Sequence, residues 1–170
     1  PTALDAVLGV VKAYTTRVGN GPLPTELEEP LATEVRKLGN EFGATTGRPR
    51  RCGWFDAVVV RYAARVNGLT GLAVTKLDVL DTLEKVAICT GYQVDGDCHE
   101  EFPGDLMLLE RAAPVYEWYE GWRTSTAGAR TLTDLPANAR RYLDRIRELA
   151  DTPISFVSVG THRDQIIEIA

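Results

Sequence analysis

Residues 43–51 carry the side chains with the clearest chemistry in the chain, in the order Gly-Ala-Thr-Thr-Gly-Arg-Pro-Arg-Arg. Glycine and proline disfavour regular structure, so this stretch is expected to be an exposed loop. Each arginine offers a planar fork of donors that fits a carboxylate or a phosphate through two hydrogen bonds. Crowded arginines also repel one another unless an anion lies nearby. The loop therefore predicts a site for a small, multiply anionic ligand; the alternative is a solvated basic turn or a hub of surface ion pairs.

A second candidate is Thr75-Lys76-Leu77-Asp78, which follows a stretch with the composition of a buried strand. A carboxylate at a strand end can accept two parallel hydrogen bonds from N1–H and the 2-amino group of guanine, and adenine lacks that donor pair. The alkyl stem of Lys76 can cover the base while its ammonium stays in water. The pattern predicts guanine recognition, with a helix cap at Asp78 as the alternative of equal weight.

A third candidate, Ser158-Val159-Gly160, also follows a predicted strand. Its backbone and small hydroxyl can close the other side of a base, although an ordinary turn is the favoured interpretation of this tripeptide taken alone. In an open α/β sheet the C-terminal ends of the strands gather along one edge. The guanine selector Asp78 and the anion-binding Arg48 and Arg50 are therefore expected to share one crevice.

The elements that must position these motifs alternate between strands and helices. Helices are expected over residues 31–38, 56–66, 78–83 and 137–150, a polar, turn-rich stretch over 95–104, and strands near 8–14, 69–75, 86–94, 115–122, 154–159 and 165–169. This alternation predicts an α/β fold, a largely parallel sheet flanked by helices. Neither a repeat nor a linker interrupts the pattern, so residues 1–170 are expected to form a single unit.

The composition limits the class of protein. With 44% hydrophobic and 25% charged residues, the chain of 170 residues is expected to build a packed core. A net charge of -5 argues against a nucleic-acid-binding protein. An apolar run long enough to cross a bilayer and a secretory signal are both absent from the sequence. Three widely spaced cysteines fit reduced thiols in a cytoplasmic protein. The run Cys98-His99-Glu100-Glu101 favours a polar turn over a metal site, because adjacent ligands cannot easily surround a tetrahedral ion.

Over most of its length the chain resembles the adenylosuccinate synthetase family. The resemblance is densest at residues 12–19, 21–26, 39–56, 67–68, 75–80 and 158–160, with Arg163 after them. These runs look like the C-terminal portion of an enzyme more than twice as long, with a phosphate-loop-related fold. The start at Pro1, in place of an initiator methionine, fits the same expectation of a fragment.

The resemblance implies a cytoplasmic, homodimeric ligase of AMP and purine nucleotide biosynthesis, which joins IMP and L-aspartate to adenylosuccinate using GTP and Mg²⁺. The terminal phosphoryl group of GTP is expected to move to the 6-oxygen of IMP, where the aspartate amine then displaces phosphate. By position, the aspartate loop would comprise Ala44, Thr45, Thr46, Gly47, Arg48 and Arg50. Arg48 would also reach IMP, Arg50 would reach GTP, and Val18 would contact the IMP ribose. Guanine would be bound by Lys76, Leu77 and Asp78 and closed in by Ser158, Val159 and Gly160.

Two departures from the family pattern qualify this expectation. The family's phosphate loop, its catalytic Asp and its catalytic His have no counterpart, so no catalytic or metal-binding residue is assigned here. These 170 residues alone are expected to be inactive, because positioned charge and proton transfer supply most of the catalysis. The pair Thr161-His162 also departs from the proline and acidic residue more usual there. The alternative function is a non-catalytic module that binds guanine nucleotides or anions, or that forms a dimer.

Overall fold

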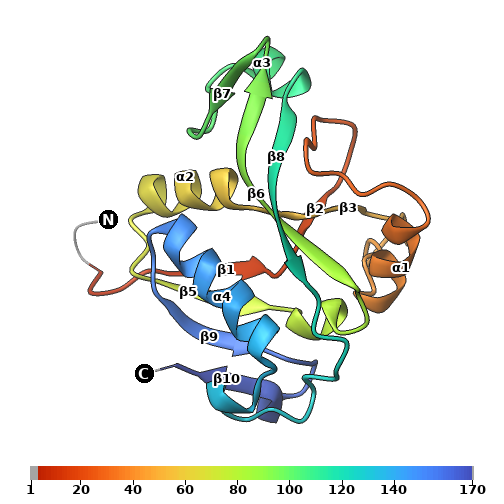
Figure 1. The fold of residues 1–170 in the computed structure, drawn as a ribbon, viewed down its shortest axis with the longest axis vertical. Helices are drawn as coiled ribbons and strands as arrows, with labels where there is room; N and C mark the ends of the chain where they lie inside the picture. The colour runs from red at the N-terminus through yellow and green to blue at the C-terminus, as the bar shows by residue number, and fades with distance from the viewer. Residues whose placement is uncertain (1–3, 170) are drawn as a thin grey trace.

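A parallel sheet with two helices on one face forms the body of the molecule (Figure 1). The structure is a computed structural model that describes residues 4–169. In the sheet the strand order is β1-β5-β9-β10, formed by Leu8–Lys12, Gly71–Thr75, Ile154–Ser158 and Ile166–Glu168. The first three strands pair in parallel and β10 is antiparallel to β9. The predicted α/β class and the largely parallel sheet are thus confirmed.

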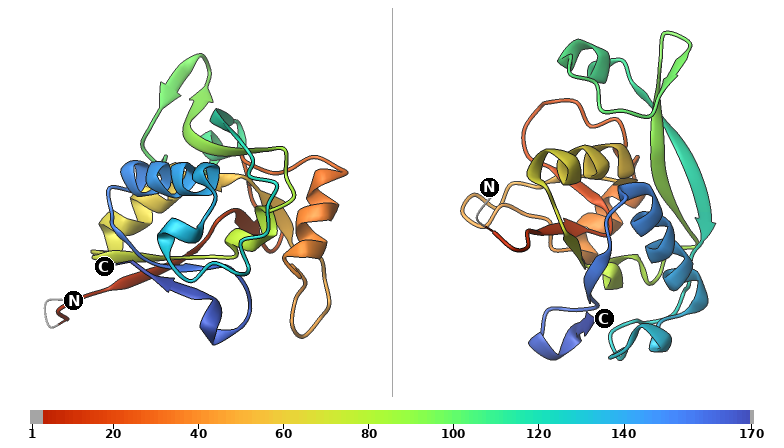
Figure 2. Two further views of the ribbon diagram at one scale, coloured as in Figure 1. Left: turned by 60° about the horizontal axis from the view of Figure 1, so that its bottom comes forward. Right: turned by 90° about the vertical axis from the view of Figure 1, so that its left-hand side faces the viewer.

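Helices α2 (Ala57–Asn67) and α4 (Ala137–Ala150) lie side by side against this sheet (Figure 2). The Asp56 carboxylate starts α2 by accepting hydrogen bonds from the amides of Val58 and Val59, and Gly68 ends it in the left-handed conformation. The apolar side of α4 packs into the core, where the hydroxyl of Tyr142 donates to the Ala13 carbonyl at 2.8 Å.

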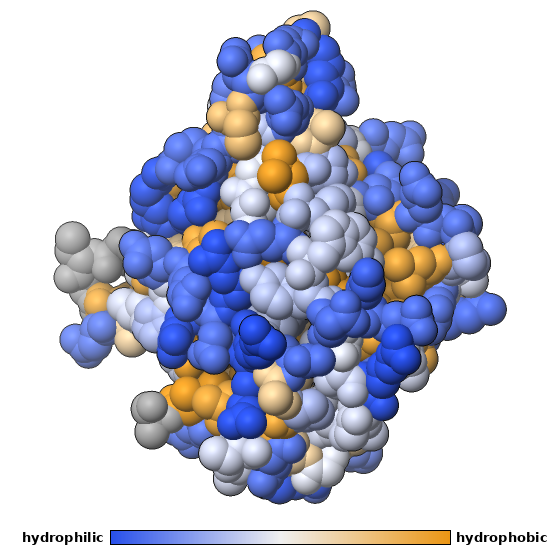
Figure 3. Space-filling view, in the orientation of Figure 1, coloured by the Kyte–Doolittle hydropathy of each residue, from blue (hydrophilic) through white to orange (hydrophobic). Residues whose placement is uncertain are grey.

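A second sheet forms an arm that projects from this body (Figure 1). Its central strand, β6 (Lys85–Val94), pairs in parallel with β4 (Phe55–Asp56) and antiparallel with β7 (Asp97–His99) and β8 (Ala113–Glu120). The arm also carries helix α3 (Leu106–Glu110), and hydrophilic side chains cover much of its surface (Figure 3). None of the helices in the described part of the chain combines the length and the apolar composition needed to cross a bilayer.

Several expected elements differ in detail from those observed. Helix α1 (Leu31–Leu38) and α4 have the expected bounds, but the strand expected over 8–14 ends at Lys12 and the chain resumes as β2 (Thr15–Arg17). The segment expected as a helix over 78–83 is a 3₁₀ turn, η1 (Leu77–Leu80), and the turn-rich stretch 95–104 contains β7. Unexpected elements are α3, β3 (Arg51–Gly53), β4 and the 3₁₀ turns η2 (Leu132–Asp134) and η3 (Arg163–Gln165).

One fully buried carboxylate, that of Glu41, joins three segments at the C-terminal edge of the main sheet. Its Oε1 accepts hydrogen bonds from Lys12 Nζ at 2.8 Å, Tyr14 Oη at 2.6 Å and Lys76 Nζ at 2.9 Å. Its Oε2 accepts one from Arg50 Nη1 at 2.7 Å. Lys12 ends β1 and Lys76 follows β5, so the parallel pairing of these strands brings the two lysines together.

The surroundings of Glu41 keep it ionised. Burial raises its pKa, but hydrogen bonds from Lys12, Tyr14, Lys76 and Arg50 outweigh burial and lower the pKa from the ordinary 4.5 to about 2. Burial and the bond to Glu41 raise the pKa of Tyr14, which therefore remains a donor. The charged carboxylate is the form that the folded chain stabilises.

Glu41→Gln is expected to lower the free energy of unfolding by about 3 kcal/mol, because it leaves three partly buried cations without a counter-charge. The pKa of Glu41 is lower in the folded than in the unfolded chain, so its stabilisation is complete above about pH 4.5 and is lost as the pH falls toward 2. Urea unfolding between pH 7 and pH 2 measures both effects, and the variant should lose less stability over the acid range than the original chain.

The matched control is Glu117→Gln. Glu117 also pairs with an arginine, Arg145 at 2.6 Å, but its side chain is 38% exposed. Its replacement should cost about 1 kcal/mol or less. Equal stability of the two variants at neutral pH would contradict the assigned role of Glu41.

Candidate functional site

The loop predicted to bind an anion is closed at its base by backbone hydrogen bonds. The Arg50 amide donates to the Glu41 carbonyl at 2.9 Å, and the Gly43 amide donates to the Arg48 carbonyl at 2.8 Å. Gly47 has a φ of +64°, which favours glycine and lets the chain reverse direction. Residues 44–49 are exposed. The loop is thus an exposed, closed turn, as the sequence predicted.

The three arginines of this loop have different environments. Arg51 pairs with Glu26, with Nε 2.7 Å from Oε1, and also donates to the carbonyls of Gly19 and Gly21. Arg50 is held by Glu41. Arg48 is exposed, and its guanidinium forms no ion pair within residues 4–169. Arg51 thus forms the surface ion pair that was the alternative prediction for this loop. The guanidinium of Arg48 remains available to a ligand.

The turn that carries Lys76, Leu77 and Asp78 lies beside this loop because both are attached to Glu41. Lys76 adopts the left-handed conformation (φ +61°), and its ammonium donates to the Gly39 carbonyl at 2.5 Å as well as to Glu41. This ammonium is thus held by a buried carboxylate, while 34% of the Lys76 side chain remains exposed. The Leu77 side chain is fully buried and fixes the turn to the core.

Asp78 is half-buried in η1 and does not cap a helix with its side chain. Burial raises the pKa of its carboxyl, the Asp81 carboxylate adds to the rise, and its own backbone amide and Lys76 oppose it. Among the described residues no other residue donates a hydrogen bond to its carboxylate. Asp78 lines a hollow of about 500 Å³ together with Asp81, Thr82, Arg123, Thr124 and Ser125.

The third motif, Ser158-Val159-Gly160, follows β9, which pairs in parallel with β5. Its position next to the turn after β5 is therefore fixed by the sheet. The Ser158 hydroxyl donates to the Gly160 carbonyl at 2.9 Å, and the buried Val159 donates its amide to the Gln165 carbonyl at 2.9 Å. These bonds are those of an ordinary turn, and the turn stands at the same sheet edge as Lys76 and Asp78.

Val18 lies beside the arginine loop. It follows β2, which pairs antiparallel with β3 so that Arg17 faces Arg51. This register places Val18 near Arg50, the residue before β3. Its side chain is 76% exposed. An exposed apolar residue beside the loop is available for contact with a ligand that the loop binds.

The electrostatics of this edge favour anions. Lys12, Lys76 and Arg50 share one carboxylate, so positive charge is in excess around Glu41. Sequence reasoning missed Glu41 and Lys12 as parts of the site, because an isolated Glu before the loop and a Lys at a strand end carry no distinctive pattern. Within residues 4–169 no group of three or more His, Cys, Asp or Glu side chains is arranged to hold a metal ion.

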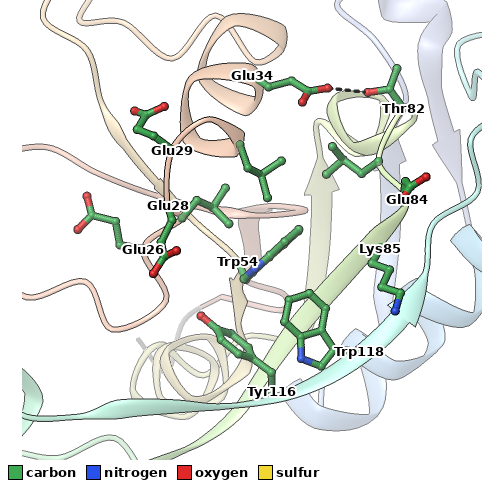
Figure 4. A pocket seen from close by; sticks show the side chains of 13 residues that line it. Glu26, Glu28, Glu29, Glu34, Trp54, Thr82, Glu84, Lys85, Tyr116 and Trp118 are labelled. Carbon is green, nitrogen blue, oxygen red and sulfur yellow. Dashed lines mark hydrogen bonds between the residues drawn. The ribbon is translucent and has the colours of Figure 1, made fainter.

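A larger hollow, about 700 Å³, lies between α1 and the arm and has a different character (Figure 4). Its wall includes Trp54, Tyr116 and Trp118, with five glutamates and Lys85 among its lining residues. The side chains of Glu34 and Thr82 meet across one end. None of the predicted site residues lines this hollow, and its acidic lining does not suit an anionic ligand.

Comparison with known proteins agrees with the geometry. The adenylosuccinate synthetase family model matches residues 1–167. The adenylosuccinate synthetases of Pelotomaculum thermopropionicum and Carboxydothermus hydrogenoformans are each 59% identical over 167 residues, which is 98% of this chain and 39% of each relative. A solved structure of fully ligated adenylosuccinate synthetase from Plasmodium falciparum has a TM-score of 0.94 at 36% identity and is matched over 99% of this chain and 41% of its own.

The chain therefore spans 39% of the length of these curated relatives. Within that span the family model matches residues 1–167, and the fold of the solved structure matches 99% of this chain. On these grounds the chain belongs to the adenylosuccinate synthetase family.

Proposed function

We propose that this chain supplies the aspartate-binding and guanine-binding elements of an adenylosuccinate synthetase, a GTP-dependent ligase of purine nucleotide biosynthesis. The observation that carries the proposal is the convergence of Arg50 and Lys76 on Glu41. It joins the loop suited to a small anion to the turn suited to guanine. In this proposal residues 1–170 are a single unit, the C-terminal portion of an enzyme that acts as a cytoplasmic homodimer.

The proposed roles follow from the hydrogen-bonding groups that each side chain has available for a ligand. The free guanidinium of Arg48 would bind an aspartate carboxylate and reach IMP, and the backbone and hydroxyls of Ala44, Thr45, Thr46 and Gly47 would complete that site. Val18 would contact the IMP ribose. Arg50, already held by Glu41, would extend toward GTP from a fixed base. The open carboxylate of Asp78 would accept the two guanine donors, with Lys76 and Leu77 beneath it and Ser158, Val159 and Gly160 opposite.

In the reaction implied by the family, the terminal phosphoryl group of GTP activates the 6-oxygen of IMP and the aspartate amine displaces phosphate. This chain's residues would bind aspartate and GTP and would contact IMP, and so place the amine near its target. Magnesium is part of the same proposal, but residues 4–169 offer no cluster of acidic or histidine side chains to hold it. We therefore assign it to parts of the enzyme outside this chain.

Asp78→Asn tests guanine recognition in a full-length synthetase that carries these residues. The asparagine side chain offers one acceptor and one donor, so the binding free energy of GTP should weaken by about 2 kcal/mol. The nucleotides of xanthine and hypoxanthine should be less strongly rejected. Values of kcat/KM for GTP, ITP and XTP measure this. Asp95→Asn, which removes half of an exposed pair with Arg111, is the control and should change none of them. An unchanged order of preference in the Asp78 variant would rule out the assignment.

Arg48→Leu tests aspartate binding in the same full-length enzyme. The loss of a charge-assisted contact should raise the aspartate KM by an amount equivalent to about 2 kcal/mol. The KM of GTP should stay within about twofold, because Arg48 and Asp78 are assigned to different substrates. Arg111→Leu on the arm provides an exposed arginine for comparison. If aspartate saturates the Arg48 variant at its normal concentration, another residue holds the carboxylate.

A second candidate function is supported by the absence of a Gly-x-x-x-x-Gly-Lys-Ser/Thr phosphate loop from these 170 residues. It is a module that binds guanine nucleotides or anions without turning them over. The polypeptide of residues 1–170, assayed alone with IMP, aspartate, GTP and Mg²⁺, is expected to form no adenylosuccinate. Measurable product, followed by absorbance, would show that the catalytic groups lie within this chain.

A further inference from the structure

Residues 122–127, here called the belt, connect the turn that carries Asp78 with the turn that follows β9. At the first end the belt is fastened by Asp81. The Oδ1 atom of Asp81 accepts hydrogen bonds from Trp122 Nε1 at 2.7 Å and from Thr126 Oγ1 at 2.9 Å, and its Oδ2 accepts one from the Thr126 amide at 2.7 Å. Trp122 and Thr126 are both buried. Three bonds to one carboxylate fix the belt against η1.

At the second end the belt is fastened by Gln165. The Gln165 side-chain amide donates to the Ala127 carbonyl at 3.2 Å, while its carbonyl oxygen accepts the His162 amide at 3.1 Å. Gln165 also accepts the Val159 amide through its backbone. A Cβ atom placed on Gly160 would come within 2.2 Å of the Gln165 side chain, so a larger residue there would require the Gln165 amide to move. The belt and the turn at 158–160 are therefore parts of one assembly.

Between its two ends the belt lines the hollow that contains Asp78. Arg123, Thr124 and Ser125 contribute one wall of that hollow. Arg123 has a φ of +46°, an unfavourable conformation for a residue with a Cβ, which the fixed neighbours Trp122 and Thr126 maintain. The belt is thus held in one shape before any ligand arrives.

Two carboxylates line the hollow, those of Asp78 and Asp81, and they differ in the hydrogen bonds that they accept. Both oxygens of Asp81 are occupied by donors from the belt, whereas no other described residue donates to the carboxylate of Asp78. Only Asp78 is left to accept donors from a base. Asp81 acts on the ligand indirectly, through the position of Arg123, Thr124 and Ser125.

We propose that the belt is a third wall of the guanine pocket and that Asp81 is the positioning residue that holds it at a fixed distance from Asp78. The inference rests on the proposed function, in which Asp78 accepts the donors of guanine. The ligand of this wall is the purine base of GTP, which would lie between Asp78 and the belt. A wall that moves would leave the base free to tilt away from Asp78.

The test is Asp81→Asn in a full-length synthetase that carries these residues. An asparagine can keep one acceptor but places a donor against another donor, so the belt should loosen. The KM for GTP is expected to rise about tenfold, the scale of one charge-assisted hydrogen bond, while the KM for aspartate stays within about twofold. A purely structural role would instead lower stability without this difference between substrates. Thr126→Val, which removes one of the three bonds, should raise the GTP KM by a smaller factor.

The matched control is Asp134→Asn. Asp134 accepts two backbone amides, from Arg130 at 3.0 Å and Thr131 at 2.9 Å, and it does not line the hollow. If Asp81→Asn and Asp134→Asn have equal GTP KM values while Asp78→Asn still alters base preference, the belt inference is overturned and the proposed function stands. If Asp78→Asn leaves base preference unchanged, the proposed guanine site itself is wrong. Should Asp81→Asn fail to fold, Thr126→Val decides: an unchanged GTP KM overturns the inference.

Discussion

The buried carboxylate of Glu41 is the interaction on which the rest of this edge depends. An ion in the interior is tolerated only when its partners are all in place, since the loss of one leaves uncompensated charge. The partners of Glu41 come from β1, from the turn after β5 and from the arginine loop. The three segments therefore cannot take up independent positions. The arginine loop and the turn after β5 are held in fixed relation by a residue that is itself fully buried.

The parallel sheet supplies the second constraint. Strands β1, β5 and β9 run in the same direction, with α2 and α4 against one face, so their C-terminal ends share an edge. Lys12, the turn at Lys76 and Asp78, and the turn at 158–160 are neighbours for this reason, although they are far apart in sequence. The arm is built mainly from antiparallel pairs and contributes none of the predicted site residues. Its connection back to α4 supplies the belt.

Local patterns in the sequence were sufficient for α1 and α4, where an amphipathic period and short-range end signals set the bounds. These patterns did not predict the bounds of elements that are set by long-range contacts. The strand over 8–14 stops at Lys12 because Ala13 and Tyr14 are held by the Thr75 carbonyl, Tyr142 and Glu41. The aromatic strand expected to reach Trp122 ends at Glu120, since the indole of Trp122 donates a hydrogen bond to Asp81. The sequence indicated the loop and the turns, but not the buried carboxylates that position them.

The arginine loop illustrates why residue type alone does not define a binding group. In sequence its three arginines are equivalent, yet Glu26 holds one, Glu41 holds another and only Arg48 is free. The Gly43 amide and the Arg48 carbonyl close the loop, so the backbone of Arg48 is fixed while its side chain is not. A ligand that reaches this loop would have to order one side chain, not a whole segment, and that lowers the entropic cost of binding. Two of the arginines are thus bound to the protein itself, and the third remains available to a ligand.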